Sequence, residues 1–146
     1  MPATGEREDP FLAFRFQVRM DGDALGGFSE VTGLSAEVEV QEVPEGGVNT
    51  FVHKLPGRAR FGNLTLRRGL ASTAMWEWFA QIVSGDIVRK TVVVELLSPD
   101  GGATPVRWVF DSAFPSRWTG PELKAEQSNV AVEAIEICHH GFLVES

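Results

Sequence analysis

The sequence predicts a mainly β fold, an antiparallel β-sandwich or barrel of about six to eight strands with one flanking α-helix. Several segments alternate apolar and polar residues with the period of two of a half-buried strand. Only one segment has the period of a helix, and Gly- and Pro-rich turns separate the segments. A length of 146 residues suits one domain of about 100 to 150 residues. We expect a flexible tail over 1–9 and a single domain over 10–146.

The first two expected strands each have one apolar face. Over 12–20 the apolar face carries Leu12, Phe14, Phe16, Val18 and Met20, and the polar face includes Arg15 and Arg19. The second strand starts at Leu34. There Ala36, Val38 and Val40 alternate with an acidic face that includes Glu37 and Glu39. Gly22, Gly26 and Gly27 supply the turn between these strands.

Residues 44–62 read PEGGVNTFVHKLPGRARFG, which matches no helical or strand period for long. We therefore expect a loop, and loops longer than about 12 to 15 residues are uncommon in compact domains unless they are functional or disordered. This segment contains Val48, Phe51, Val52 and Leu55, and disordered linkers are poor in such residues. The loop is expected to order against either its own barrel or a neighbouring subunit.

A short strand with Leu64 and Leu66 on its apolar side precedes the one expected helix. Ser72 or Thr73 would cap this helix, and Gly85 sits where a left-handed terminating residue belongs. Residues at the spacing of one helical face follow the cap, namely Met75, Trp76, Phe79, Ile82 and Val83. Burial of Trp76, Phe79 and Ile82 at about 1.5 to 3 kcal/mol each would hold the helix on the sheet.

The C-terminal half predicts a hairpin and a final strand. The ranges 91–97 and 106–111 would pair across the turn at 98–104, with Trp108 and Phe110 on one face. In the final strand, 129–138, Val130 and Val132 point inward and Ile135 and Ile137 have the opposite parity. A bulge near Glu133 would reconcile them. The expected core includes Phe14, Phe16, Trp76, Phe79, Ile82, Trp108 and Phe110.

Charge is distributed unevenly along the chain. Residues 46–76 contain no Asp or Glu but five cations, which are Lys54, Arg58, Arg60, Arg67 and Arg68. Residues 1–45 carry 10 carboxylates and 3 cations, and residues 77–146 carry 10 and 5. A basic segment on one copy would complement the acidic surface of the next, which favours head-to-tail association.

Composition excludes several classes of protein. No run of about 18 apolar residues is present to span a membrane. The N-terminus MPATGEREDP is polar and resembles neither a signal nor a transit peptide, so we expect synthesis and assembly in the cytoplasm with no membrane anchor. The single Cys138 excludes an internal disulfide framework. The net charge of -7 argues against specific nucleic-acid binding.

The residues favour neither a metal site nor catalysis. Cys138, His139 and His140 form the one cluster of candidate zinc ligands, but structural zinc needs four ligands and adjacent strand residues point to opposite faces. We expect these histidines on the surface or at a subunit contact. The Gly-Gly pairs lack the strand-to-helix context of a phosphate-binding loop. We therefore predict no cofactor, no metal and no enzyme activity.

Several stretches together resemble the tail tube protein family of contractile phages and the inner tube proteins of extracellular contractile injection systems. They are GGFSEVTGL at 26–34, EGGVNTFVHKLPG at 45–57, LTLRRGL at 64–70 and RWTGPEL at 117–123. With the helix and the final strand, they span nearly the whole chain in the family's order. The absence of Tyr and the Ala59-Arg60 pair depart from the family's pattern.

The resemblance implies a tail-tube fold, which is shared with the tube protein of type VI secretion systems, and an assembly of stacked hexameric rings. Polar strand faces would then line the lumen, with Arg15, Arg19, Glu37 and Glu39 as candidates. The 44–62 loop would reach an adjacent ring, with Val48, Asn49, Phe51, His53 and Lys54 as its contact residues. Implied partners are further copies of the chain, a surrounding sheath protein, baseplate and tube-initiating paralogues, and a cargo effector in the lumen.

The resulting interpretation is a structural subunit of the inner tube of a phage-tail-like injection particle. The alternative of another class is a monomeric β-barrel that binds a small ligand in its mouth. A weaker alternative is a cysteine-dependent enzyme using Cys138. Within the tube interpretation, the principal subunit and a baseplate-proximal paralogue both remain open.

Overall fold

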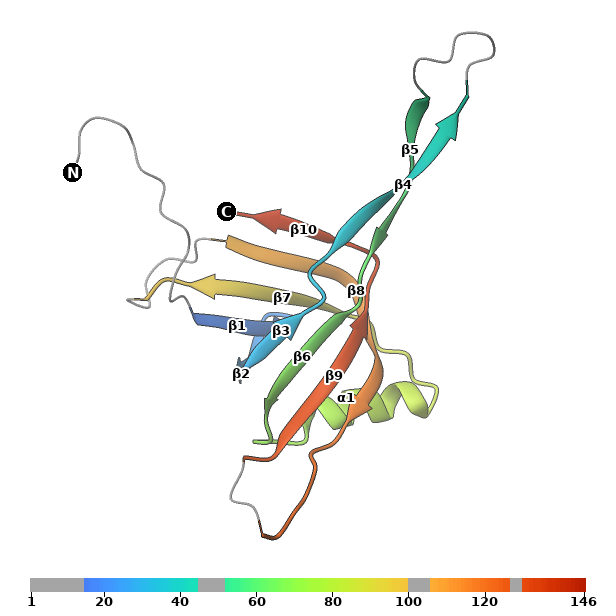
Figure 1. The fold of residues 1–146 in the computed structure, drawn as a ribbon. Helices are drawn as coiled ribbons and strands as arrows, with labels where there is room; N and C mark the ends of the chain where they lie inside the picture. The colour runs from blue at the N-terminus through green and yellow to red at the C-terminus, as the bar shows by residue number, and fades with distance from the viewer. Residues whose placement is uncertain (1–14, 45–51, 100–105, 127–129) are drawn as a thin grey trace, which may run out of the picture.

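The computed structural model describes residues 15–44, 52–99, 106–126 and 130–146, with the backbone alone for 23–27. These residues form ten strands and one helix, shown in Figure 1. The strands of the first half are β1 (Arg15–Met20), β2 (Asp23–Gly27), β3 (Glu30–Thr32), β4 (Ala36–Val43), β5 (His53–Phe61) and β6 (Leu64–Gly69). The remaining elements are α1 (Ala74–Val83), β7 (Lys90–Leu97), β8 (Val106–Thr119), β9 (Val132–Cys138) and β10 (Phe142–Glu145). The mainly β fold with one flanking helix is thereby confirmed, although with more strands than predicted.

Eight of the strands form one antiparallel sheet in the order β2-β1-β7-β8-β9-β6-β3, with β10 beside β8. The first half of β8 pairs with β7 on one edge and with β10 on the other, and its last residues pair with β9. β8 therefore belongs to both halves of the sheet, which curls around the core (Figure 1). The remaining two strands, β4 and β5, pair only with each other among the described residues.

A change of parity inside β8 allows this curl. Phe110, Ala113 and Pro115 are all buried, so the inward set moves by one residue between positions 110 and 113. Ser112 lies between them with a φ of 52°, in the left-handed region. One residue in that conformation turns the strand, so the two halves of β8 present successive side chains to the same core.

The core fills the concave side of the curled sheet. Its fully buried members come from five strands and include Val18, Leu64, Leu66, Val92, Phe110, Ile135 and Ile137. Phe16 and Trp108 are partly buried and pack against this cluster. Phe14 lies outside the described residues. Alternation of apolar residues therefore predicts the inward faces of β1 and β6 correctly.

The helix begins and ends where its sequence signals place it, but its buried face is shifted. Met75 is buried as predicted, and Phe79 and Ile82 are partly buried. Gly85 has a φ of 95° and its N–H donates to the Ile82 carbonyl at 3.1 Å. The buried residues are Met75 and Trp78, and the Trp78 indole N–H donates to the Val88 carbonyl at 2.9 Å. Trp76 is instead 43% exposed, which corrects its expected core position.

Within the described ranges no helix is long and apolar enough to cross a bilayer.

The structure corrects the expectation for residues 34–62. Residues 36–43 form a strand as predicted, but both of its faces are exposed, including Val38 and Val40. Residues 53–61 are a second strand rather than part of a loop. The apolar and acidic alternation of β4 was correctly taken as a strand, yet alternation alone does not tell whether the apolar face is covered.

The final strand is also corrected, because the register between β6 and β9 is uninterrupted and needs no bulge at Glu133. Val132 is 41% exposed and Val130 is 75% exposed, whereas Glu133 is fully buried on the same face as Ile135 and Ile137. The buried carboxylate pairs with Arg68, whose Nε lies 2.9 Å from Glu133 Oε1. A buried charge is tolerated when it is paired. Glu133 therefore occupies the inward-facing position of β9, where the prediction had placed Val132.

We predict that Trp78→Ala lowers the free energy of unfolding of the unassembled protein by about 3 to 5 kcal/mol, since it removes a buried aromatic side chain and leaves a cavity. Trp76→Ala serves as the matched control and should lose less than half as much. Urea denaturation followed by circular dichroism measures both values. Equal losses for the two variants would contradict the assignment of Trp78 as the residue that anchors the helix.

We predict that Glu133→Gln costs about 3 to 5 kcal/mol of unfolding free energy, because it leaves the buried Arg68 without its counter-ion. The control is Glu30→Gln, which breaks a half-exposed ion pair with Arg67 of the same 2.9 Å length. The control should lose less than about 1 kcal/mol. A cost for Glu133→Gln no larger than that of the control would refute the proposed role of the buried pair.

Candidate assembly surfaces

β4 and β5 form an arm that projects away from the curled sheet, at the opposite end of the molecule from α1 (Figure 1). Every residue of both strands is exposed. A two-stranded hairpin without cover is marginally stable by itself. The arm therefore lacks the packing that stabilises the rest of the fold and presents both faces outward.

The two faces of the arm differ in chemistry. The register places Val38 opposite Ala59 and Val40 opposite Pro56, and residues directly opposite each other share a face. Val38 and Val40 are 51% and 57% exposed, so this apolar face meets solvent. Glu37, opposite Arg60, lies on the other face by alternation. Contiguous exposed apolar residues mark contact sites on soluble proteins.

Two of the five predicted contact residues, His53 and Lys54, fall at the far end of the arm. His53 lies opposite Val43 and Lys54 opposite Glu42 at the start of β5, and both are exposed. Val48, Asn49 and Phe51 lie outside the described residues. The interpretation that residues 44–62 fold back over their own barrel does not fit β5, because His53–Phe61 stands exposed along its whole length.

The basic segment does not form one basic patch. Two of its cations form ion pairs within the subunit, Arg67 with Glu30 and Arg68 with Glu133. In the register of the arm, Lys54 lies opposite Glu42 and Arg60 opposite Glu37. Part of the positive charge predicted to attract a second copy is therefore paired or lies beside a carboxylate inside the subunit. The exposed apolar residues of the arm remain as the larger source of contact free energy.

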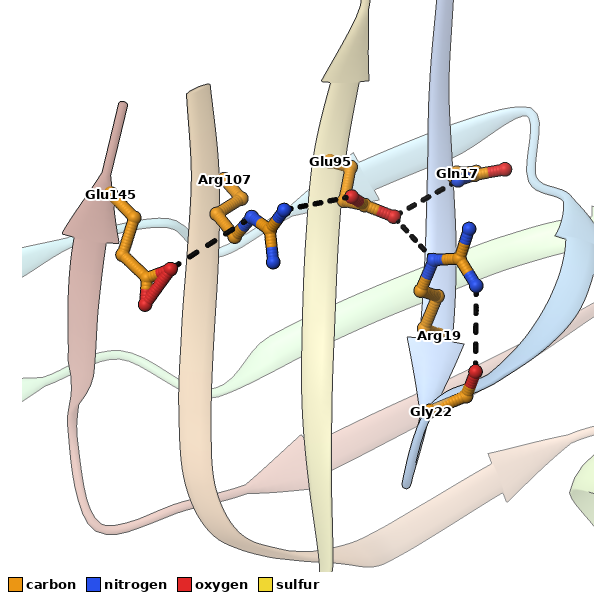
Figure 2. A network of polar contacts seen from close by, with 6 residues as sticks. All are labelled: Gln17, Arg19, Gly22, Glu95, Arg107 and Glu145. Carbon is orange, nitrogen blue, oxygen red and sulfur yellow. Dashed lines mark hydrogen bonds and ion pairs between the residues drawn. The ribbon is translucent and has the colours of Figure 1, made fainter. Parts of the chain in front are cut away.

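A second surface is the convex face of the sheet, which carries a row of polar side chains across β1, β7, β8 and β10. The register places them side by side, and we term them the charged row: Gln17, Glu95, Arg107 and Glu145. Figure 2 shows these side chains with Arg19, which also reaches Glu95. The row alternates in charge from Glu95 through Arg107 to Glu145, so neighbouring strands attract one another.

Glu95 is the centre of this surface and is only 4% exposed. Its Oε1 accepts hydrogen bonds from Gln17 Nε2 at 2.9 Å and from Arg19 Nε at 2.6 Å. Arg107 lies on the other side, with a nitrogen 3.7 Å from Glu95 Oε2 and its Nε 3.8 Å from Glu145 Oε1. The carboxylate is therefore enclosed by donors and cations rather than by apolar side chains (Figure 2).

These contacts lower the pKa of Glu95. Burial by itself would raise the pKa, but the hydrogen bonds from Gln17 and Arg19 and the charges of Arg19 and Arg107 outweigh it. A carboxylate with a lowered pKa in the folded state stabilises the fold above its unfolded pKa. That stabilisation is lost as the pH falls through the folded value.

The predicted lumen residues separate into two groups. Arg15 and Arg19 lie on β1, where they share the face of the charged row by alternation. Glu37 and Glu39 lie on the arm and not on this face. Glu95, the partner of Arg19, was not among the residues predicted from the sequence. It is the one carboxylate in the apolar run TVVVELL. A single acidic residue in such a run, at a position that faces away from the core, is the signal that could have identified it.

The cysteine and histidine cluster gathers no metal site. Across the described ranges, no three Cys, His, Asp or Glu side chains are placed to hold an ion. Cys138 is partly buried. His140 Nε2 lies 3.4 Å from an Arg89 nitrogen. His139 Nε2 lies 2.8 Å from the carbonyl oxygen of Gly62, the residue that follows β5. The two histidines thus have different surroundings.

A curled antiparallel sheet with one flanking helix and a projecting two-stranded arm defines a structural protein of the tail tube class. The family model described as T4-like virus tail tube protein gp19 matches residues 12–143. The chain belongs to this family. A search of curated proteins found no match.

Solved structures give the same class. The chain is similar to one in the cryo-EM structure of an extracellular contractile injection system, PVC sheath/tube terminator in extended state, with a TM-score of 0.85, 26% identity, and coverage of 95% of this chain and 99% of that chain. A chain of the anti-feeding prophage tube-terminating cap matches with a TM-score of 0.87, 25% identity, and coverage of 99% and 96%. Hcp1 from Flavobacterium johnsoniae, at 16% identity, shares the fold, with a TM-score of 0.56 and coverage of 90% and 94%.

We predict that Glu95→Gln lowers the free energy of unfolding at neutral pH by about 1 to 2 kcal/mol, because it removes the charge that accepts from Gln17 and Arg19. It should also flatten the loss of stability on acidification below about pH 4.5, since the group responsible no longer titrates. Chemical denaturation at a series of pH values measures both effects.

The control for this prediction is Glu145→Gln, whose carboxylate is half-exposed and 3.8 Å from Arg107. It should change stability by less than about 1 kcal/mol. If the loss of unfolding free energy on acidification is the same in Glu95→Gln as in the wild type, Glu95 does not cause the pH dependence.

Proposed function

We propose that this protein is the structural subunit of the inner tube of a phage-tail-like contractile injection system. Copies assemble into hexameric rings, and the rings stack into a conduit for cargo. The observation that carries the proposal is the exposed arm, whose apolar face has no cover within the described part of the subunit. Family membership supports it, as does likeness to a chain of the PVC sheath-tube complex at 26% identity and a TM-score of 0.85.

The edges of the sheet support ring formation. β2 and β3 end the sheet, and within the described residues β10 pairs only with β8. An edge strand presents unpaired N–H and C=O groups that bond readily to another strand. Leu143 and Val144 on β10 are 70% and 58% exposed, so this edge also offers apolar surface. In the proposed ring, edges of neighbouring subunits join and the unpaired groups are satisfied.

The convex face of the sheet is the proposed lumen lining. It carries Arg15, Arg19 and the charged row, and ion pairs join Arg19, Glu95, Arg107 and Glu145 within the subunit. A bore lined by both signs of charge would offer passing cargo little net attraction. Glu37 and Glu39 lie on the arm, so in this arrangement they face a neighbouring subunit rather than the bore.

The remaining parts of the proposal follow from this assembly. The subunit acts passively and is not an enzyme. Assembly takes place in the cytoplasm, inside a surrounding sheath and from a baseplate with tube-initiating paralogues, and the tube becomes part of the particle. The arm joins successive rings, with His53 and Lys54 at its far end and Val48, Asn49 and Phe51 in the segment between its strands.

A small-ligand-binding monomer is the second candidate, and one apolar hollow on the subunit is a possible pocket for the ligand. The hollow has a volume of about 270 Å³ and is lined mainly by Leu70, Trp76, Trp118 and Pro121. Ligand pockets are usually about 300 to 1,000 Å³, so this hollow is small for the role. A ligand-binding barrel would remain monomeric at every concentration.

We predict that the purified protein forms rings or tubes in negative-stain electron microscopy, and that Val40→Asp abolishes tubes. A carboxylate in the arm's apolar face would have to be buried unpaired in the contact between rings. Val83→Asp is the matched control, because Val83 is 69% exposed on α1, and it should leave tubes intact. Elution mass at low and high salt gives the oligomeric state independently.

Circular dichroism should show the same folded spectrum for both variants. A wild-type protein that stays monomeric at all concentrations, or tubes that persist in Val40→Asp, would contradict the proposed role of the arm.

A further inference from the structure

The arm joins the body through two short segments, 33–35 and 61–63, which we term the neck. The Gly62 N–H donates to the Ser35 carbonyl at 3.1 Å, which ties the segments together. Gly33 has a φ of 93° and lies against the backbone of Asn63, where a Cβ would collide. A Cβ on Gly62 would likewise collide with the Ser35 hydroxyl. The neck is therefore packed backbone against backbone, and its orientation depends on what holds it to the sheet.

His139 holds the neck to the turn between β9 and β10. Its Nε2 lies 2.8 Å from the Gly62 carbonyl oxygen, and its Nδ1 lies 3.0 Å from the Gly141 N–H. A carbonyl only accepts and a backbone N–H only donates, so Nδ1 is the acceptor and Nε2 carries the proton. The neutral imidazole thus bridges Gly62 of the neck and Gly141 of the body.

Aromatic packing surrounds this bridge. Phe61, the last residue of β5, lies edge-on to His139 and Phe142, with ring centroids 6.2 and 5.3 Å away. Phe110 lies beneath His139 at 4.8 Å. Gly141 has a φ of 114°, and a Cβ there would come within 3.0 Å of the Phe61 ring. The end of β5 therefore rests on the body through a close ring contact and the one imidazole hydrogen bond.

We propose that His139 is the positioning residue that sets the direction of the arm, through the hydrogen bond from its Nε2–H to the Gly62 carbonyl. This inference rests on the proposed function, in which the arm must meet the next ring at a fixed angle. A small rotation at the neck becomes a large displacement at the far end of an eight-residue strand, since each strand residue adds about 3.3 Å. Fixing one carbonyl at the pivot therefore decides whether the apolar face of the arm meets its target.

The test uses two substitutions that each keep one half of the imidazole. His139→Gln places an amide N–H near the Nε2 position and keeps the bond to Gly62, whereas His139→Asn reaches only the Nδ1 position and loses it. His140→Gln is the matched control at the exposed neighbouring histidine. We expect His139→Asn to reduce the sedimentable tube fraction roughly tenfold, as the loss of one hydrogen bond implies. His139→Gln and His140→Gln should assemble like the wild type.

A second readout follows the arm directly in the unassembled, full-length protein. Spin labels on Gln41→Cys in the arm and Ser116→Cys in the body, with Cys138→Ser to remove the native thiol, give the distribution of distances between arm and body. We expect a broader distribution for His139→Asn than for His139→Gln. Phe61→Leu, which removes the ring contact but keeps an apolar residue, should also broaden it and replaces His139→Asn if that variant fails to fold.

Two outcomes would overturn the inference. One is equal widths and equal assembly for His139→Asn and the wild type. The other is an equal defect in His139→Gln and His139→Asn, which would assign the role to the ring and not to the bond. If the wild type forms no rings or tubes, the proposed function fails, and the distance distributions still decide whether His139 orients the arm.

Discussion

The buried ion pair between Arg68 and Glu133 is the constraint on which the positions of three strands and the helix depend. Arg68 lies on β6 and Glu133 on β9, and their atoms are 2.9 Å apart with both side chains almost fully buried. The Trp118 indole of β8 donates to the second carboxylate oxygen at 3.2 Å. A further Arg68 nitrogen donates to the Ser72 hydroxyl just before α1, at 3.2 Å. One carboxylate and one guanidinium therefore fix β6, β8, β9 and the start of the helix together.

Such a pair is tolerated only because its polar atoms are satisfied. Across the described residues, no buried side-chain nitrogen or oxygen lacks a hydrogen-bond partner. Removing one partner would leave the other charge buried at a cost of several kcal/mol. The geometry of the pair holds β6 and β9 in one register. In this register Leu66 and Ile135 lie opposite each other, and both are buried in the core. The arm has no comparable constraint beyond its neck, and Val38 and Val40 on its apolar face are 51% and 57% exposed in the subunit.

Much of the fold could be predicted because strand alternation reports which residues are inward. Leu64 and Leu66 show this, as does the hairpin of β7 and β8. The same alternation in β4 does not reveal that Val38 and Val40 are exposed, because alternation indicates an apolar face and not what covers it. An apolar strand face outside the core therefore carries the same pattern as a core strand.

Charged side chains inside apolar runs were the second source of error. Glu133 and Glu95 each sit in a strand of Val, Ile and Leu, and each is buried by partners that lie far away in the sequence. Register alone brings Arg68 to Glu133 and Arg107 to Glu95. The positions of these partners depend on which strands are neighbours, which local periodicity does not contain. The helix is another case, because Trp76 and Trp78 lie on roughly opposite sides of it, and packing against the sheet decides that Trp78 is buried.

These local pairings change the physical account of how copies would associate. The basic segment from Gly46 to Trp76 suggested attraction between a basic loop and an acidic neighbour. In the fold, Arg67 and Arg68 are paired within the subunit, and Lys54 and Arg60 of the arm lie opposite its own glutamates. With a net charge of -7 on each copy, long-range electrostatics between identical subunits is repulsive. In the proposed assembly, association comes from short-range burial of the arm's valines and from joined strand edges. Both contacts depend on geometry rather than on attraction at a distance, so the proposed assembly requires a defined direction of the arm more than it requires charge.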